Sequence, residues 1–328
     1  MAVPVPKPNL YPPFNIVRAS HVEFVVTDLD ASRAFYADTL GLQITEQSRE
    51  HICLRGLEER GQHCIILRKG RDAAAGPLFF KVFDDSDLDK IEAFFEARGL
   101  AAHWIEQPHQ GRTLRAADPQ GMPLGFYARM DRLPPMHQKY ALHRGARPLR
   151  IDHFNCFSPD VDAATFFYNE MGFRVTEYTE DEESGLLWAV WMHRKGGVHD
   201  IAFTNGAGPR LHHIALWVQS PLHIIDLLDV MSTSGYLASV ERGPGRHGIS
   251  NAFFLYLRDP DGHRIELYCS DYQTVDPDHE PIKWDLKDPQ RQTLWGAPAP
   301  RSWFEEGSAF EGTPVREPKL KAQPIIAP

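Results

Sequence analysis

The sequence lacks the features that mark several protein classes. Its 4 cysteines form no CxxC pair, which argues against a disulfide framework and a cysteine zinc site. No apolar run approaches the roughly 20 residues that span a bilayer, and the Pro-rich start MAVPVPKPNLYPPF does not resemble a signal peptide. The net charge is −9 and Lys and Arg form no cluster. We therefore expect a soluble cytoplasmic protein with neither nucleic-acid nor membrane partners.

Histidine, in contrast, is abundant, with 16 residues in a chain of 328. Most histidines in proteins serve no chemistry, so their positions must decide which ones matter. The length suits two ordinary domains. A hydrophobic content of 42% and a charged content of 24% are typical of globular proteins.

An internal repeat divides the chain into two halves. HVEFVVTDLDASRAFY, from His21, resembles HFNCFSPDVDAATFFY, from His153, and HCIILRKG resembles HDIAFTNG further on. ADPQGMPLGFY and RDPDGHRIELY form a later matching pair. The pattern of apolar residues and turns predicts two strand–helix–strands units in each half, with Asp30 and Asp162 as candidate helix caps. We expect an α+β fold of two domains, each made of two tandem βαβββ modules.

The segments outside the repeat suggest the domain boundaries. We expect a non-catalytic domain over residues 1–134, a linker over 135–148 and a catalytic domain over 149–288. Residues 289–328 are rich in Pro, Trp and Arg and are predicted to be an irregular tail that wraps the second domain.

The two copies differ at positions that could carry chemistry. The second half has His153, His213 and Glu266 where the first half has His21, Phe80 and Gly125. A purely structural role should have served both copies alike, because both have the same backbone to support. The asymmetry predicts chemistry in the second domain and a scaffold role for the first.

Strand alternation selects His213 over its neighbour His212 as the inward residue, together with Leu211. Glu266 stands in the apolar strand RIELY, where an unbound carboxylate would be costly. If the turn DPDGH closes a hairpin, Tyr256 lies directly across from Glu266 on the same face.

Two imidazoles and one carboxylate on neighbouring strands form a facial triad with open coordination positions. This ligand set suits mononuclear Fe(II) and oxygen chemistry, and Mn(II) fits the same nitrogen and oxygen donors. Closed structural zinc sites take four protein ligands, so a set of three favours catalysis or substrate binding.

The second half resembles the type I extradiol ring-cleavage dioxygenases of the vicinal oxygen chelate superfamily, above all members that act on 3,4-dihydroxyphenylacetate. The stretches that carry this resemblance lie between about Arg150 and Trp303, and the N-terminal half matches more weakly. They are RIDHFN, AVWMHRKGGVHD, GPRLHHIA, ERGPGRHGISNAFFLY and RDPDGHRIELY. The resemblance implies that each pair of modules forms an open, curved mixed β-barrel. It also implies a homo-oligomer, often a tetramer.

The resemblance further implies a role for each matching residue. The triad His153, His213 and Glu266 would bind the metal, and His199 would steer O2, the co-substrate, and act as acid and base. Tyr256 and His247 would hydrogen-bond the oxygens of a catechol.

Asn155 and Trp191 would line the substrate pocket, and Arg242 would hold the substrate carboxylate. Arg291 is also matched to the pocket. Gln292 departs from the pattern, because close relatives have a second carboxylate-anchoring Arg at that position. Ring cleavage is therefore expected, while the substituent at position 4 of the catechol stays open.

Two other classes compete with this reading. A metal-dependent isomerase or lyase of the superfamily usually draws ligands from both halves of its paired modules, and here the first half offers only His21. A ligand-binding protein on the same fold would need no metal ligands. Stoichiometric iron, oxygen uptake and a yellow product from a catechol would separate the three classes.

Overall fold

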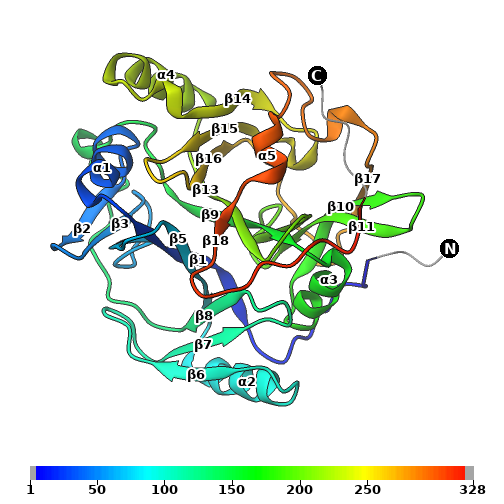
Figure 1. Ribbon diagram of the computed structural model, residues 1–328. Helices are drawn as coiled ribbons and strands as arrows, with labels where there is room; N and C mark the ends of the chain where they lie inside the picture. Colours follow the sequence, from blue (N-terminus) through cyan, green and yellow to red (C-terminus); the bar gives the residue numbers. More distant parts are fainter. Residues whose placement is uncertain (1–4, 322–328) are drawn as a thin grey trace.

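The computed structural model describes residues 5–321, so part of the Pro-rich start and the last seven residues of the expected tail lie outside it. The first half of the chain forms an eight-stranded sheet in the order β2-β3-β4-β1-β5-β8-β7-β6 (Figure 1). Its strands are β1 (Ile16–Val26), β2 (Gln43–Gln47), β3 (His51–Arg55), β4 (Ile65–Lys69), β5 (Ala74–Val82), β6 (Ala102–Ile105), β7 (Thr113–Ala117) and β8 (Pro123–Tyr127).

The second half forms a ten-stranded sheet in the order β14-β15-β16-β13-β9-β12-β11-β10-β17, with β18 paired to β13. Its strands are β9 (Arg150–Ser158), β10 (Arg174–Asp181), β11 (Leu186–His193), β12 (Ile201–Asn205), β13 (Arg210–Trp217), β14 (Val240–Arg246), β15 (Phe253–Arg258), β16 (Arg264–Cys269), β17 (Ile282–Asp285) and β18 (Ser308–Ala309).

The two sheets repeat one topology, as the sequence repeat predicts. In the first sheet β1 pairs in parallel with β4 and antiparallel with β5, and β5 pairs in parallel with β8. In the second sheet β9 has the same relation to β12 and β13, and β13 to β16. The prediction of an α+β fold with two βαβββ modules in each half is therefore confirmed.

One helix follows the first strand of each module. These helices are α1 (Leu29–Arg33), which continues as the π-helix η1 (Ala34–Thr39), α2 (Asp85–Glu96), α3 (Val161–Glu170) and α4 (Pro221–Ser234). A short α5 (Arg301–Glu305) and the 3₁₀ turns η2 (Tyr140–Leu142), η3 (Leu237–Ser239), η4 (Ile249–Asn251) and η5 (Pro289–Arg291) complete the set of helical segments.

The helix caps differ slightly from the sequence prediction. Asp28 and Asp160 accept the backbone N–H groups at the starts of α1 and α3, whereas Asp30 and Asp162 lie within the first turns. An N-cap residue needs extended backbone so that its side chain can reach back to the free N–H groups, and Asp28 and Asp160 have that conformation.

A hydrophobic core joins the two sheets. Phe80 of β5 lies 5.7 Å from Phe154 of β9 and 5.3 Å from Phe173, measured between ring centroids. Phe80 and Phe154 are fully buried. Burial of apolar side chains is the main stabilising term in a domain. Because residues of both sheets share this core, the two halves form one packed unit.

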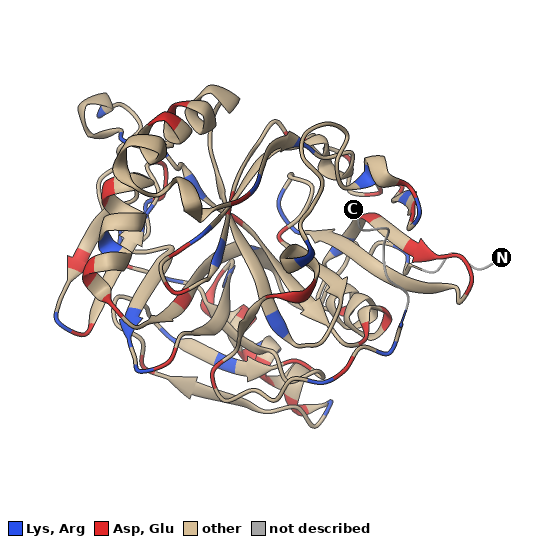
Figure 2. Cartoon of the chain, turned by 45° about the horizontal axis from the view of Figure 1, so that its top comes forward, with Lys and Arg blue, Asp and Glu red and all other residues tan. Residues whose placement is uncertain are grey.

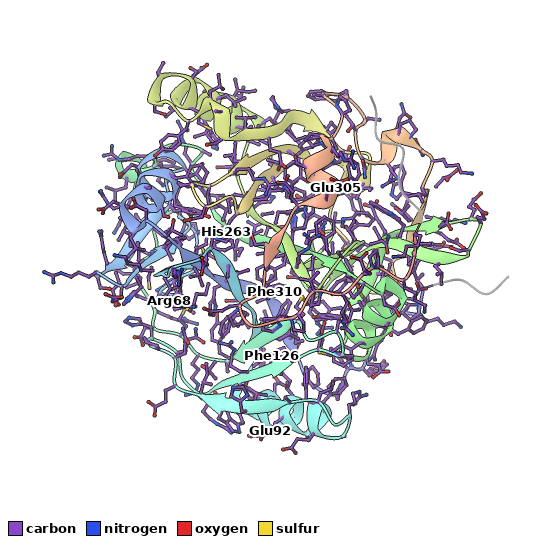
Figure 3. All side chains as sticks on the ribbon, viewed as in Figure 1. Arg68, Glu92, Phe126, His263, Glu305 and Phe310 are labelled. Atoms are coloured by element: carbon purple, nitrogen blue, oxygen red, sulfur yellow. The ribbon has the colours of Figure 1, made fainter. Side chains whose placement is uncertain are left out.

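The C-terminal tail crosses both halves, where the sequence prediction had it wrapping the second domain. β18 extends the second sheet beside Arg210 and Leu211 of β13. Phe310, the next residue, is buried in the common core and bridges Ala75 of the first sheet (Figure 3). The tail therefore fastens the two sheets to each other.

A buried carboxylate anchors this tail to the second sheet. Glu241 accepts hydrogen bonds from Arg258, Arg264 and the Ser302 hydroxyl of α5. Burial would raise the pKa of Glu241, but the hydrogen bonds and charge of Arg264, followed by those of Arg258, lower it from 4.5 to about 2. The ion pair contributes stability above pH 4.5 that is lost as the pH falls toward 2.

We expect Glu241→Gln to lower the free energy of unfolding by about 2 kcal/mol at pH 7. The gap between wild type and variant should close as the pH falls below 4.5, which denaturant titrations at several pH values measure. Glu92→Gln on α2, at the opposite end of the molecule from Glu305 of α5, is the control (Figure 3). A constant gap across the acid range would contradict the prediction.

Charged residues of both signs are interspersed over the described chain (Figure 2). Among residues 5–321, no helix is both long and apolar enough to cross a membrane.

Candidate metal centre

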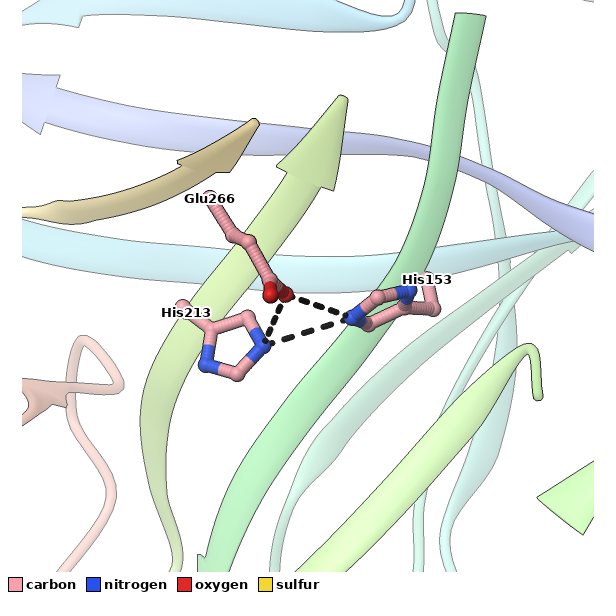
Figure 4. A group of neighbouring side chains, drawn as sticks. All are labelled: His153, His213 and Glu266. Carbon is pink, nitrogen blue, oxygen red and sulfur yellow. Dashed lines mark hydrogen bonds and ion pairs between the residues drawn. The ribbon is translucent and has the colours of Figure 1, made fainter. Parts of the chain in front are cut away.

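Three neighbouring strands bring His153, His213 and Glu266 together (Figure 4). Ala215 of β13 pairs with His153 of β9 on one side and with Glu266 of β16 on the other. Because an alanine side chain is a single methyl group, it leaves open the space into which the imidazole and the carboxylate converge. His213 lies two residues earlier on β13 and closes the group of three.

The spacing of the three side chains fits one shared ion. The Nε2 atoms of His153 and His213 are 3.3 Å apart, and each lies 3.1 Å from Oε2 of Glu266. Ligands held about 2.1 Å from a metal are about 3.0 Å apart at right angles and about 3.4 Å apart at tetrahedral angles. The observed separations fall within that range.

Burial and charge also favour a bound cation. All three side chains are at most 2% exposed, and Oε1 of Glu266 has no hydrogen-bond partner among the described residues. Burial would raise the pKa of Glu266, but the close ring nitrogens of His153 and His213 hold it well below the ordinary value. Burial lowers the pKa of His213 to about 4, which leaves a neutral imidazole able to bind a metal.

His153 is oriented by its neighbour in sequence. Its Nδ1 lies 3.0 Å from Oδ2 of Asp152, so Nδ1 carries the proton and the Nε2 lone pair faces the site. Burial would raise the pKa of Asp152, but Lys195 and His153 hold it well below the ordinary value. Sequence reasoning missed Asp152, although its place directly before His153 in IDHF is a usable signal.

The inward assignment of His213 is confirmed, but the strand alternation around it is not regular. A bulge between Leu211 and His213 shifts the register of β13. Leu211, expected to share the face of His213, packs in the same core cluster as Ile214 and Leu216. His212, expected to face outward, is 1% exposed beneath the tail. An extra residue at a bulge resets which side chains face the core.

The ring of His199 packs against the ring of His153. Its ring centroid is 3.7 Å from that of His153, and it lines the central cavity. Burial and the neighbouring His153 place the pKa of His199 well below its ordinary value, so the imidazole is neutral. Its Nδ1 has no hydrogen-bond partner in residues 5–321. A neutral, unpartnered imidazole can accept and return a proton.

Tyr256 and His247 form a hydrogen-bonded pair beside the carboxylate ligand. Tyr256 pairs with Glu266 across the β15–β16 hairpin, as the turn in the sequence predicts. Its hydroxyl is 3.0 Å from Nε2 of His247, whose Nδ1 donates to the carbonyl of Gln292. The neutral His247 therefore presents an acceptor nitrogen to the Tyr256 hydroxyl. Both side chains line the cavity.

The cavity beside the triad contains most of the predicted substrate residues. Asn155, Trp191, Arg291 and Gln292 line it, and Arg242 is not among its lining residues. The lining residues that sequence reasoning missed are Trp188, Thr204, Ile249, Ser250, Tyr268 and Trp303. Tyr268 stands two residues after Glu266, so alternation along the strand could have found it. The tail residue Trp303 has no such signal.

Arg291 and Arg242 have different surroundings. The guanidinium of Arg291 lies 4.8 Å from the Trp188 ring and is almost fully buried. Its Nε donates to the Leu286 carbonyl, and it forms no ion pair with a described carboxylate. Its Nη1 and the Nε2 of Gln292 both lack a hydrogen-bond partner among the described residues. Arg242 donates from Nη2 to the Gln292 carbonyl and the Thr293 hydroxyl, so it braces the segment that carries Arg291. Its Nε and Nη1 also have no partner among the described residues.

In the first half, a side chain fills the space that corresponds to the metal site. Phe79 of β5 pairs with His21 and Gly125, the relation that Ala215 has to His153 and Glu266. The Phe79 ring stacks on His21 at 4.0 Å and fills the space where a side chain at Gly125 would lie. The sequence comparison matched Phe80 to His213, but Phe80 points into the core, so Phe79 is the blocking residue. Where a strand contains a bulge, equivalent positions of the two copies cannot be found by aligning the sequences residue by residue.

Comparisons with known proteins agree with this geometry. The model of the Glyoxalase/Bleomycin resistance protein/Dioxygenase superfamily matches residues 150–267, and a bleomycin resistance protein-like N-terminal model matches residues 18–56. Among curated proteins, a manganese-dependent 2,3-dihydroxybiphenyl 1,2-dioxygenase from Geobacillus genomosp. 3 is 29% identical over 86% of this chain and 94% of its own length.

Solved structures show higher similarity. The homoprotocatechuate 2,3-dioxygenase of Brevibacterium fuscum, in an anaerobic complex with 3,4-dihydroxyphenylacetate, is 42% identical over 95% of this chain and 99% of that one, with a TM-score of 0.89. The homoprotocatechuate 2,3-dioxygenase of Arthrobacter globiformis is 41% identical over 95% and 98% of the two chains, with a TM-score of 0.90.

Proposed function

Because the chain belongs to the extradiol ring-cleaving dioxygenases of the glyoxalase (vicinal oxygen chelate) superfamily, we propose that it cleaves 3,4-dihydroxyphenylacetate with O2. The product is 5-carboxymethyl-2-hydroxymuconate semialdehyde, and the ring opens beside the diol. The observation that carries the choice of substrate is the buried guanidinium of Arg291, which lies in the same cavity as the metal triad and whose Nη1 has no partner among residues 5–321. On the resemblance alone we also propose a cytoplasmic location and a homotetrameric assembly. Analytical ultracentrifugation tests the assembly.

The metal is proposed to be Fe(II), held by His153, His213 and Glu266. Bound there, the metal would supply Lewis-acid chemistry that acidifies a catechol hydroxyl, and it would bring the ring and O2 together. The manganese-dependent relative shows that the family also works with Mn(II), so metal analysis of anaerobically purified protein decides between the two.

The side chains around the triad divide the remaining work. When the substrate binds, Tyr256 and His247 exchange the hydrogen bond between them for bonds to the two catechol oxygens. They hold the substrate asymmetrically, because the neutral His247 accepts and Tyr256 donates. His199, which contacts the His153 ring, holds and returns a proton, and its Nδ1 has no partner among residues 5–321. Asn155 and Trp191 line the pocket around the catechol ring. Asn155 is fixed by a hydrogen bond of 3.2 Å that the Thr204 hydroxyl donates.

The acetate group of the substrate is assigned to Arg291 and Gln292. Their unpartnered Nη1 and Nε2 donors line one cavity, and a buried cation without a counter-charge is costly until an anion arrives. Arg291 thus supplies the positive charge that is lost because this chain has Gln292 where close relatives have arginine. Arg242, which does not line the cavity, is assigned to positioning that segment through its bonds to Gln292 and Thr293.

We expect Arg291→Met to reduce kcat/KM for 3,4-dihydroxyphenylacetate by about 10- to 100-fold, because a charge-assisted hydrogen bond contributes about 1.5–3 kcal/mol. The rate with 4-methylcatechol, which has no carboxylate, should change by less than about 3-fold. Steady-state oxygen uptake with both substrates measures the split.

A wider panel tests the substrate itself. Catechols bearing acetate, carboxylate, alkyl or no substituent should rank with the acetate first, and a yellow product with oxygen uptake should accompany each turnover. Arg301→Met on the exposed face of α5 is the matched control and should leave the ranking unchanged. Equal rates with and without the carboxylate would remove the assignment to 3,4-dihydroxyphenylacetate and leave ring cleavage in place.

A further inference from the structure

His212 stands between a metal ligand and the C-terminal tail. Its Nδ1 lies 2.6 Å from Nδ1 of His213, and its Nε2 lies 2.7 Å from the backbone oxygen of Trp303 in α5. Both histidines are at most 2% exposed. The result is an unbroken chain of contacts from the tail backbone through two imidazole rings to the Nε2 that faces the metal position.

The placement of protons along this chain follows from the last acceptor. A carbonyl oxygen only accepts, so Nε2 of His212 carries the hydrogen that bonds to Trp303. In a neutral imidazole the other nitrogen is then an acceptor, so Nδ1 of His212 accepts a hydrogen bond that Nδ1–H of His213 donates. His213 is left with its lone pair on Nε2, the atom 3.1 Å from Glu266.

The tail is held in register at this point. β18 pairs with Arg210 and Leu211, the residues directly before His212. Arg264 donates from one nitrogen to the His212 carbonyl at 3.0 Å and to the Glu306 carbonyl at 2.9 Å. The Trp303 ring stands edge-on to the His212 ring, with centroids 4.6 Å apart. The Trp303 carbonyl is therefore fixed relative to the strand that carries both histidines.

We propose that His212 is a positioning residue that presents the Nε2 lone pair of His213 to the metal, with its own tautomer set by the Trp303 carbonyl. The C-terminal segment thereby completes the metal site without supplying a ligand. This inference rests on His213 binding the metal. The bulge in β13 is what allows adjacent histidines to meet, because regular alternation would have sent them to opposite faces.

Two isosteric variants separate the two contacts. His212→Asn keeps an oxygen near the position of Nδ1 and can still accept from His213. His212→Gln keeps a donor near the position of Nε2 for Trp303 and loses the acceptor. We expect the affinity for Fe(II), titrated anaerobically into chelator-treated protein, to stay within about 3-fold of wild type in the Asn variant and to fall about 10- to 100-fold in the Gln variant.

His263→Gln is the matched control, because this buried histidine also bonds a backbone carbonyl and the tail, through Val25 and Ser308, and touches no ligand of the metal (Figure 3). It should lower the melting temperature and leave the Fe(II) affinity unchanged. If His212→Gln does not fold, His212→Leu, which also lacks the acceptor, gives the same comparison.

Equal Fe(II) affinities in wild type and His212→Gln would overturn the positioning role, and so would an Asn variant as weak as the Gln variant. Wild-type protein that takes up no Fe(II) would instead overturn the proposed function together with this inference. The two failures are therefore distinguishable in one titration series.

Discussion

Replacing His153 with alanine is expected to abolish stoichiometric metal binding and to reduce ring cleavage by at least about 10³-fold. The magnitude follows because the metal supplies several kcal/mol of transition-state stabilisation, and each 1.36 kcal/mol is about tenfold in rate. The variant also removes from the buried Glu266 the ring nitrogen that lies 3.1 Å from its Oε2. Metal content of protein purified without oxygen, together with oxygen uptake, measures both effects.

The first half offers a matched control for this experiment. His21 occupies the equivalent place in β1, is fully buried, and bonds Gln110 and stacks on Phe79. His21→Ala should cost about 2–4 kcal/mol of stability, as buried large-to-small changes do, and leave the metal content at one ion per chain. If His21→Ala removed the metal as completely as His153→Ala, the division into a catalytic half and a scaffold half would be wrong.

Replacing His199 with phenylalanine should reduce kcat by about 10²- to 10⁴-fold while the metal is retained, because a positioned acid–base group contributes about that much. Phenylalanine preserves the ring that contacts His153 at 3.7 Å and removes the nitrogens. Single-turnover measurements should show slower chemistry with little change in the KM for the catechol. Unchanged turnover and intermediate lifetimes would remove the acid–base assignment.

His63 provides the control for this second variant. It follows the same sequence pattern in the first half, is 4% exposed, and shares Gln110 with His21. The amide of Gln110 lies within hydrogen-bond distance of both Nε2 atoms, so His63 has a structural partner, whereas Nδ1 of His199 has none among residues 5–321. His63→Phe should therefore affect stability and leave kcat unchanged.

The sequence carried the main features of the site because they depend on local pattern. The repeat predicted the topology of both sheets, and the turn DPDGH set the register that places Tyr256 across from Glu266. The difference between the copies located the half in which His153, His213 and Glu266 come together. Each of these inferences needs only strand alternation, a turn or a comparison of letters, which act over a few residues.

Other predictions failed where a bulge or a distant segment intervened. The bulge before His213 turned Leu211 into the core and brought His212 against His213. In the first half, the irregular pairing of β1 with β5 placed Phe79, and not Phe80, on His21. A one-residue shift of register moves a side chain to the opposite face, and no local pattern in the sequence marks it.

The sequence by itself determined the family of folds, the three metal-binding side chains and the half of the chain in which they lie. The tertiary structure alone decided that Arg291 faces the cavity, that Phe79 closes the first half, and that Trp303 reaches His212 across 91 residues. The physical reason is that these contacts join segments distant in the chain, and only packing of the tail against the second sheet determines which atoms meet.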